Sequence, residues 1–378
     1  MRPIDRREFL ASAAALAGLA ALPAAAHAAA GEMHWPRFRD ALIVDACGSP
    51  GRTTEADPRP PLDAGELADI HASGLSAINL TVGSVGRYAN ALEETMQVIA
   101  FWDREIAAQP QALLKITHGA QLDEAKRSGR LGIIFGFQDT TMYGENLDHF
   151  DLFHDLGVRI VQLTYNRRNL MGDGCLEPGN AGLSKLGNEM IAKMNERGTL
   201  LDLSHCGQRT TREGIQASHK PVAVTHSGCS AVADMPRNKR DEELKLLADR
   251  GGVVGIYFMP YLRTQGQVMA EDVLKHIEHA LDVCGEDHVG IGSDGTISEV
   301  KLTAEYKKLF AAEVAERAKR GIGAPGERAD SYTFALDLNM PTRLERLAAL
   351  LAQRGHGEAR IEKILGGNFA RLMREAIA

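Results

Sequence analysis

Two histidines near the middle of the chain have the residue type and the setting of a metal site. His205 follows the apolar run 198–204, and His226 follows a second apolar run, 221–225, with residues of helical character between the two. Two short apolar strands joined by a helix form a βαβ unit, so we expect the strands to be parallel neighbours. Both imidazoles then lie at the carboxyl ends of adjacent strands, where barrels and open sheets place their chemistry. Imidazole is a common metal ligand and general base, although a strand-end histidine can also be purely structural.

Polar side chains follow most of the other predicted strands as well. Behind four further apolar runs come Asp45 and Cys47, Gln138 and Asp139, Tyr165 and Asn166, and Asp294. Most of these side chains can bind a metal or transfer a proton. A carboxylate after the last strand of a barrel suits a metallohydrolase base or ligand, although Asp294 also suits an ordinary turn residue.

The elements that position these residues alternate between strand and helix. Between residues 41 and 294 we count about eight strand–helix units, without a compositional break that would mark a second domain. Eight such units over roughly 250 residues are typical of a single (β/α)8 TIM-like barrel, an α/β fold. A doubly wound sheet is the alternative. A charged segment follows the last strand, and helices are expected at 343–354 and 361–377.

The first 28 residues are expected to be a targeting segment rather than part of the fold. Residues 5–10 hold a twin-arginine motif, an Ala/Leu run follows, and residues 26–28 offer a small-x-small cleavage site. We therefore expect a twin-arginine signal peptide at 1–28, a single barrel at 29–378 and a periplasmic location. Past the signal no apolar run approaches the roughly 20 residues of a membrane span, so no stable membrane anchor is expected.

The balance of charge argues against a nucleic-acid partner. The whole chain has a formal charge of −7, and removal of residues 1–28, which hold three arginines and two acidic residues, leaves −8. Lysines and arginines are scattered along the chain, without the basic stripe that nucleic-acid-binding proteins present.

Six short motifs are more specific than the strand pattern. They are Gly182-Leu-Ser-Lys-Leu-Gly187, Leu201-Asp-Leu-Ser-His205, Thr225-His-Ser227, Pro236-Arg-Asn238, Asp287-His-Val-Gly-Ile-Gly-Ser-Asp294 and Leu365-Gly-Gly-Asn-Phe369. Together they resemble the membrane (renal) dipeptidases, zinc peptidases of the amidohydrolase type, from about Leu42 to Met373. The resemblance implies a barrel of the metallo-dependent hydrolase type, a small peptide substrate, zinc as cofactor, and a homodimer, which is common in the family.

The resemblance also implies roles for individual residues. The family's counterparts of His205 and His226 bind the second of two zinc ions. The counterpart of Arg237 binds the substrate carboxylate, which suits a planar guanidinium, and Asn238 beside it belongs to the same substrate-binding motif. The counterpart of Asp294 ligates the first zinc and helps to handle the proton of the attacking water.

The chain departs from the family at four positions of the site. Cys47 and Ser49 stand where the family has a His-x-Asp metal pair, Gln138 stands where a glutamate bridges the two zincs, and Tyr165 stands where a histidine stabilises the reacting carbonyl oxygen. A neutral glutamine is a poor bridge and serine rarely ligates zinc, so we expect one zinc ion rather than two.

The expected single ion has two possible ligand sets. His205 and His226 would bind the ion together with Asp294, or together with Cys47 if the Cys47 thiolate lies close enough to the ion. Asp139, next to Gln138, could take over a carboxylate role.

Three functions follow from this altered site. The first is an exported hydrolase of dipeptides or related small amides with a free carboxylate, with Asp294 and Tyr165 as catalytic groups. The second is a catalytically silent barrel that binds a peptide or cell-wall fragment through Arg237. The third is a different reaction on a carboxylate-bearing substrate, with Cys47 and Tyr165 as acid, base or nucleophile.

Overall fold

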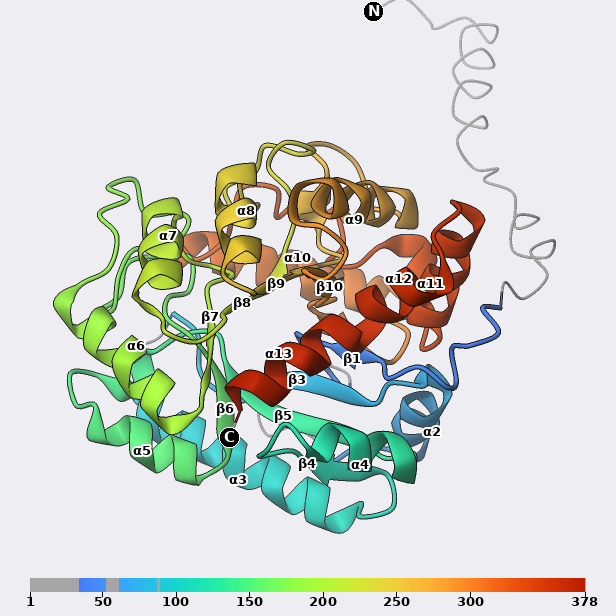
Figure 1. Ribbon diagram of the computed structural model, residues 1–378, viewed down its shortest axis with the longest axis horizontal. Helices are drawn as coiled ribbons and strands as arrows, with labels where there is room; N and C mark the ends of the chain where they lie inside the picture. Colours follow the sequence, from blue (N-terminus) through green and yellow to red (C-terminus); the bar gives the residue numbers. More distant parts are fainter. Residues whose placement is uncertain (1–33, 52–60, 87–88, 378) are drawn as a thin grey trace, which may run out of the picture. The chain divides into compact units, whose positions relative to one another are not determined.

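Eight parallel strands follow one another around the sheet in the computed structural model (Figure 1). The amide of Ala46 donates to the carbonyl of Ile291 at 2.9 Å, which brings the first and last strands together into a nearly closed barrel. The predicted (β/α)8 barrel is therefore confirmed. In sheet order the strands are β1 (Val44–Asp45), β3 (Ala77–Thr81), β5 (Leu131–Phe137), β6 (Val158–Gln162), β7 (Leu200–Asp202), β8 (Ala223–Ser227), β9 (Val253–Ile256) and β10 (Val289–Ile291).

The structure describes residues 34–51, 61–86 and 89–377. The predicted signal peptide at 1–28, with its cleavage site, lies outside the described residues. Within the described residues, one predicted strand falls off the barrel path, because β4 (Leu113–Lys115) pairs with β5 alone. A separate pair of short strands, β2 (Gly48–Ser49) and β11 (Gly295–Thr296), ties the loop after β1 to the loop after β10.

Helices follow the strands and cover the outside of the barrel, as Figure 1 shows. No helix in the described part of the chain is both long and apolar enough to cross a membrane. The helices are α2 (Ala64–Ser73), α3 (Ala91–Ala108), α4 (Gln121–Ser128), α5 (Asp148–Asp155), α6 (Lys185–Arg197), α7 (Gln208–Ala217), α8 (Asp241–Asp249), α9 (Ala270–Cys284), α10 (Ala304–Lys319), α11 (Arg343–Gln353), α12 (Glu358–Glu362) and α13 (Asn368–Ala376).

Local sequence explains where these helices begin and end. Asp63 accepts from the amide of Glu66, and Glu66 returns a bond to the amide of Asp63, a capping box that starts α2. Gly74, with φ 67°, ends the same helix in the left-handed conformation that glycine adopts without strain.

The helix expected at 361–377 is interrupted. A five-residue π segment, Lys363–Gly367, separates α12 from α13. A Cβ on Gly366 would lie 2.2 Å from the carbonyl oxygen of Leu42, so only glycine lets this segment approach the start of β1. A tight contact with the barrel, which local periodicity does not report, thus breaks the helix.

Helix α13 seals the end of the barrel opposite the predicted site. In Figure 1 it crosses in front of the strands, and its Phe369 and Met373 pack with Val44, Ile134 and Leu200 from the barrel interior. Each buried side chain of this size stabilises the fold by roughly 1.5–3 kcal/mol. With this end filled by side chains, the opposite end, where the strands finish, is left to form the site.

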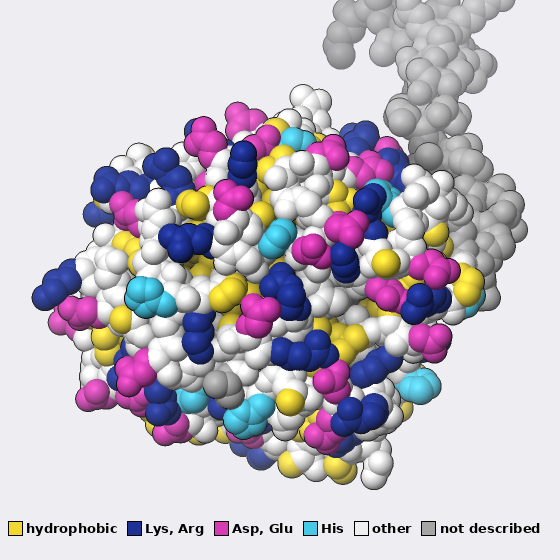
Figure 2. All heavy atoms as spheres, in the orientation of Figure 1, with side chains coloured by type: hydrophobic (Ala, Val, Ile, Leu, Met, Phe, Trp, Pro, Cys, Tyr) yellow, Lys and Arg dark blue, Asp and Glu magenta, His cyan; other side chains and the backbone are white. Residues whose placement is uncertain are grey.

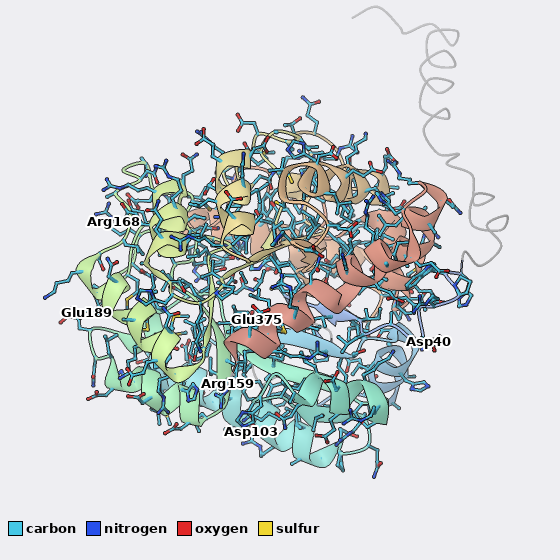
Figure 3. The ribbon with its side chains drawn as sticks, viewed as in Figure 1. Asp40, Asp103, Arg159, Arg168, Glu189 and Glu375 are labelled. Carbon is cyan, nitrogen blue, oxygen red and sulfur yellow. The ribbon has the colours of Figure 1, made fainter. Side chains whose placement is uncertain are left out.

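The surface carries charges of both signs. On the face shown in Figure 2, basic and acidic side chains alternate over the helices. Figure 3 places Glu189 on α6 and Arg168 at the outer edge of the barrel, where Arg168 forms an ion pair with Asp173 at 2.7 Å.

Candidate active site

Three of the predicted ligands converge at the carboxyl ends of the strands. Ligand atoms of Cys47, His226 and Asp294 all lie within 4.8 Å of one another. His205 adjoins this cluster, since its Nε2 is 2.9 Å from Nε2 of His226. The structure therefore gathers all four predicted metal ligands, although His226 lies within β8 rather than after it.

The orientation of His205 is fixed by Asn166. The amide nitrogen of Asn166 donates to the carbonyl of Ile322 at 2.7 Å, which leaves its oxygen to accept from Nδ1 of His205 at 2.6 Å. This hydrogen bond assigns the proton of His205 to Nδ1 and leaves a lone pair on Nε2. Arg237 donates to that lone pair at 3.0 Å.

The orientation of His226 is fixed by a buried carboxylate behind it. The hydroxyl of Thr225 lies 2.6 Å from Asp202 and 2.8 Å from Nδ1 of His226. Since an ionised carboxylate only accepts, Thr225 donates to Asp202 and accepts from Nδ1 of His226. Asp202 also receives the amide and the hydroxyl of Ser204. This Asp202–Thr225–His226 chain has the form of the outer partners that orient metal-binding histidines.

The residues present fit one metal ion. With both Nδ1 atoms protonated, the two Nε2 atoms, 2.9 Å apart, both offer lone pairs, and a cation bound by both would take the place of the Arg237 donor at His205. Burial, with Arg237 nearby, lowers the pKa of both histidines well below the usual range, so both imidazoles are neutral and able to ligate. Two histidines with a cysteine or a carboxylate form an accepted zinc donor set.

Cys47 and Asp294 form the other side of the cluster. The Cys47 sulfur is 3.6 Å from a carboxylate oxygen of Asp294. Burial and the neighbouring Asp294 raise the pKa of Cys47 well above its ordinary value, and burial raises the pKa of Asp294 to about 6. Without a cation the pair therefore shares a proton on the thiol, and a cation would favour its release.

Two further positions at which the resemblance indicates a departure from the family, Ser49 and Gln138, form local hydrogen bonds. Ser49 donates to the carbonyl of Gly51 at 3.1 Å. The amide of Gln138 donates to the Cys47 sulfur at 3.3 Å and to Thr81 at 2.9 Å. Both side chains therefore support the site without offering the carboxylates of a second metal centre.

Asp139, considered above as a replacement carboxylate, lies apart from the cluster. It is buried and accepts from the amides of Gly86 and Thr140 and from the side chain of Asn169, each at 2.8 Å. These bonds connect the loops that follow β3, β5 and β6.

A cavity of about 320 Å³ opens beside the cluster, with Tyr165, His205 and Arg237 among its lining residues. The side chain of Arg237 is 1% exposed, and its guanidinium donates to the Ser204 carbonyl at 2.8 Å and to His205. None of the ion pairs formed by the described residues involves Arg237. A buried guanidinium without a carboxylate partner is costly, so a ligand carboxylate in this cavity would be strongly favoured.

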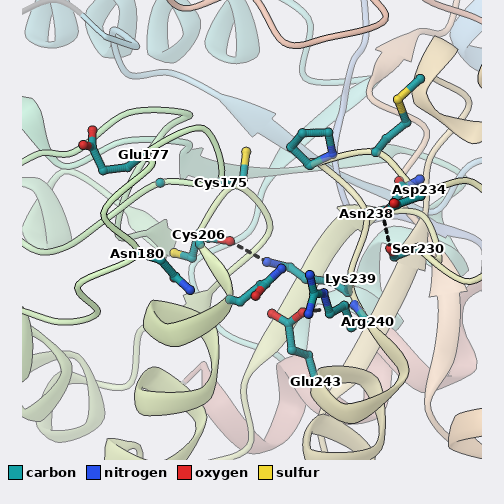
Figure 4. A pocket seen from close by; sticks show the side chains of 15 residues that line it. Cys175, Glu177, Asn180, Cys206, Ser230, Asp234, Asn238, Lys239, Arg240 and Glu243 are labelled. Carbon is teal, nitrogen blue, oxygen red and sulfur yellow. Dashed lines mark hydrogen bonds between the residues drawn. The ribbon is translucent and has the colours of Figure 1, made fainter.

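Asn238 faces a different space, the pocket shown in Figure 4. Its amide nitrogen donates to the carbonyls of Ala233 and Tyr261, and its oxygen accepts from the hydroxyl of Tyr257. These bonds shape the loop that carries Arg237, and the predicted contact of Asn238 with substrate stays a prediction.

Two residues of the site escaped the sequence analysis, Arg317 on α10 and Glu327 after it. Arg317 forms a bidentate pair with Glu327 at 2.8 and 2.9 Å and donates to the hydroxyl of Tyr165 at 3.1 Å. The ring of Tyr165 in turn stacks on His205, with centroids 4.2 Å apart. Phe310, Val314 and Arg317, spaced four and three residues apart, form one helical face toward the cavity, and this spacing was the available signal.

Comparison with known proteins places this site in a family. Residues 52–322 match the membrane dipeptidases, Peptidase family M19. Dipeptidase verJ of Clonostachys rogersoniana is 32% identical over 237 residues, which cover 61% of this chain and 61% of that protein. Dipeptidase tcpJ of Claviceps purpurea is 29% identical over 255 residues, which cover 66% of this chain and 52% of that protein. The chain thus spans less than two thirds of the length of these curated relatives.

Solved structures share the barrel. An amidohydrolase from Pseudomonas aeruginosa superposes with a TM-score of 0.76 at 30% identity, over 90% of this chain and 98% of that one. Dipeptidase AC, a metallo peptidase of family M19, superposes with a TM-score of 0.70 at 21% identity over 89% of this chain and 99% of that one, a likeness of fold alone. With the family match covering most of the barrel, and a candidate metal site at its carboxyl end, the chain belongs to the membrane dipeptidases, Peptidase family M19.

Proposed function

We propose that this chain hydrolyses dipeptides, or related small amides with a free carboxylate, with the help of one metal ion. The observation that carries the proposal is the buried Arg237 guanidinium, which lacks a carboxylate partner among the described residues and lines a cavity beside the metal-binding cluster. A small substrate with a terminal carboxylate fits both the charge and the size of this space.

The proposed ligands of the ion are His205, His226, Cys47 and Asp294. A zinc ion bound there supplies a Lewis acid and lowers the pKa of water. Arg237 binds the substrate carboxylate, which orients the scissile amide toward the cluster. Asp294 accepts and returns a proton.

In this proposal Tyr165 stabilises the carbonyl oxygen of the scissile amide. Because its hydroxyl oxygen accepts from Arg317, its own proton is free to donate to the carbonyl oxygen of the substrate.

The test is metal content measured together with turnover. We expect about one zinc per chain by elemental analysis, and hydrolysis of a dipeptide panel that chelation abolishes and zinc restores. Dipeptides blocked as C-terminal amides should be poor substrates. Arg237→Leu should lose the distinction between free and blocked dipeptides, while Arg168→Leu at the surface should keep it. Full activity in metal-free protein would refute the proposal.

A second candidate is a catalytically silent barrel that binds a peptide or cell-wall fragment. It is favoured by Ser49 and Gln138, whose hydrogen bonds to Gly51, Cys47 and Thr81 stabilise the protein without metal. Calorimetric binding of dipeptides to the metal-loaded protein, with no product formed over days, would support this function over hydrolysis.

We further propose that the chain is exported by the twin-arginine pathway to the periplasm. The support is the motif at residues 5–10 and the apolar run after it. Replacement of Arg6 and Arg7 by lysine should keep the protein in the cytoplasmic fraction as the longer precursor, and an unchanged distribution would contradict the proposal.

A further inference from the structure

A second, larger chamber adjoins the catalytic cavity. Its volume is about 490 Å³, against about 320 Å³ for the cavity that holds Arg237. Asp294 lines both spaces, so the chamber and the cavity adjoin at this carboxylate of the cluster. The residues that line both spaces are Asp294, Gly295, Phe310, Glu313 and Thr333.

The aromatic side chains of Phe258, Tyr306, Phe310 and Phe334 line the chamber together with polar and charged residues. Tyr306 and Phe310, one turn apart on α10, have nearly parallel rings with centroids 5.9 Å apart. Phe334 stacks on Tyr332 at 5.7 Å, and Tyr332 in turn contacts Phe310 at 5.5 Å. Phe258 and Leu338 add buried apolar surface to the lining.

Two cations of the described residues line the chamber, and of these Lys301 is exposed while the charge of Arg343 is compensated inside the protein. Arg343 is 5% exposed, forms an ion pair with Asp45 at 3.4 Å and donates to the hydroxyl of Ser293 at 3.1 Å. A charged ligand group would therefore gain little from Arg343 and would lose its hydration, whereas an uncharged apolar group gains the full contact with the rings.

The two spaces also set the direction of the substrate. Arg237 lines the catalytic cavity and is not among the residues that line the chamber. If the substrate's terminal carboxylate lies at Arg237 and its scissile amide at the cluster, the part of the substrate on the other side of that amide is the part that meets Asp294 and the chamber.

We propose that the second chamber binds the acyl side of the substrate, and that this side carries an aromatic or bulky aliphatic group. The inference rests on the proposed function, because the carboxylate at Arg237 fixes which end enters the chamber. Burial of such a group between aromatic rings favours it over hydrogen in the same position by roughly one to two orders of magnitude in kcat/KM. The substrates are therefore dipeptides or acyl amino acids whose first residue or acyl group is large and apolar.

Two dipeptide series test the inference on the zinc-loaded full-length protein. In the first series the N-terminal residue changes from glycine to leucine to phenylalanine before alanine, and in the second the C-terminal residue changes after alanine, with both stereoisomers there. We expect kcat/KM to rise about tenfold or more along the first series only. Equal values along the first series, or an equal rise along both, would overturn the inference while leaving hydrolysis established.

A chamber-filling variant sharpens the result. Val300 lines the chamber, and its backbone bonds to Asn339 do not involve its side chain, so Val300→Trp should fill the space and remove the preference for phenylalanine over glycine. Leu309→Trp on α10, at a position 60% exposed, is the matched control and should keep the preference. If neither dipeptide is hydrolysed, the proposed function fails. The chamber is then judged by calorimetry, where stronger binding of Phe-Ala than Gly-Ala supports it and equal binding refutes it.

Discussion

Removal of the Thr225 hydroxyl should weaken metal binding far more than its size suggests. Thr225→Val keeps the shape of the side chain but deletes the group that lies 2.6 Å from Asp202 and 2.8 Å from Nδ1 of His226. Without that acceptor, His226 gains by moving its proton to Nε2, the atom that the metal requires. Loss of such an outer partner typically costs 10–100-fold in metal affinity, so we expect the metal dissociation constant to rise by about that factor.

The same variant should cost moderate stability. Asp202 keeps the hydroxyl of Ser204 at 2.6 Å and the amides of Ser204 and Thr225 at 3.0 Å, so it loses one of four hydrogen bonds. We expect the free energy of unfolding of the metal-free protein to fall by about 1–2 kcal/mol.

Competition with a chromophoric chelator measures the first effect and urea unfolding the second, with Thr225→Ser as the control. Thr225→Ser retains the hydroxyl and should bind metal nearly as the wild type does, although the lost methyl group lowers its stability by about 1 kcal/mol. Equal metal affinities for Thr225→Val and Thr225→Ser would refute the claim that the Thr225 hydroxyl, held by Asp202, keeps the proton of His226 on Nδ1.

Three further predictions concern other parts of the site and its supports. Cys47→His combined with Ser49→Asp and Gln138→Glu should raise bound zinc from one to two per chain by elemental analysis, since the resemblance places these three side chains at the family's ligand positions. An unchanged zinc content would contradict that placement. Arg317→Met should destabilise the protein by about 3–5 kcal/mol in urea unfolding, because it leaves the buried Glu327 unpaired. The double variant Arg317→Met with Glu327→Met should recover much of this loss, and no recovery would contradict the burial of an unpaired charge as its cause. Burial lowers the pKa of His276 from 6.5 to about 4, with Asp272 opposing it, so folding favours the neutral ring. The free energy of unfolding should therefore fall by about 1.4 kcal/mol for each pH unit as the pH is lowered from 6.5 to 4. His276→Gln should reduce this slope, and an unchanged slope would refute the assignment to His276.

The barrel and the convergence of its ligands followed from periodicity and from strand ends. Apolar runs such as 131–137 coincide with the strand observed, because a strand buried on both faces is written as a continuous apolar segment. The sequence predicted that His205, His226 and Asp294 lie close together, because parallel strands end at the same edge of a barrel.

The rest depended on contacts that periodicity does not encode. The charged segment after β10 forms α10, whose amphipathic signal is weak because most of its residues face solvent while only a few reach the cavity. The pairing of Arg317 with Glu327, and the use of Asn238 to shape a loop, are tertiary events between residues that no spacing rule connects. The break before α13 likewise comes from the contact of Gly366 with β1.

The place of α10 in the chain separates two properties of the protein. The proposed metal ligands sit at the ends of barrel strands, whereas Phe310, Arg317, Glu327 and Phe334 come from one continuous stretch after the last strand. Exchange of that stretch between homologues could therefore alter substrate range while the reaction chemistry stays in place. Substitutions among the proposed metal ligands could likewise change the metal centre without altering the segment that lines the cavity and the chamber.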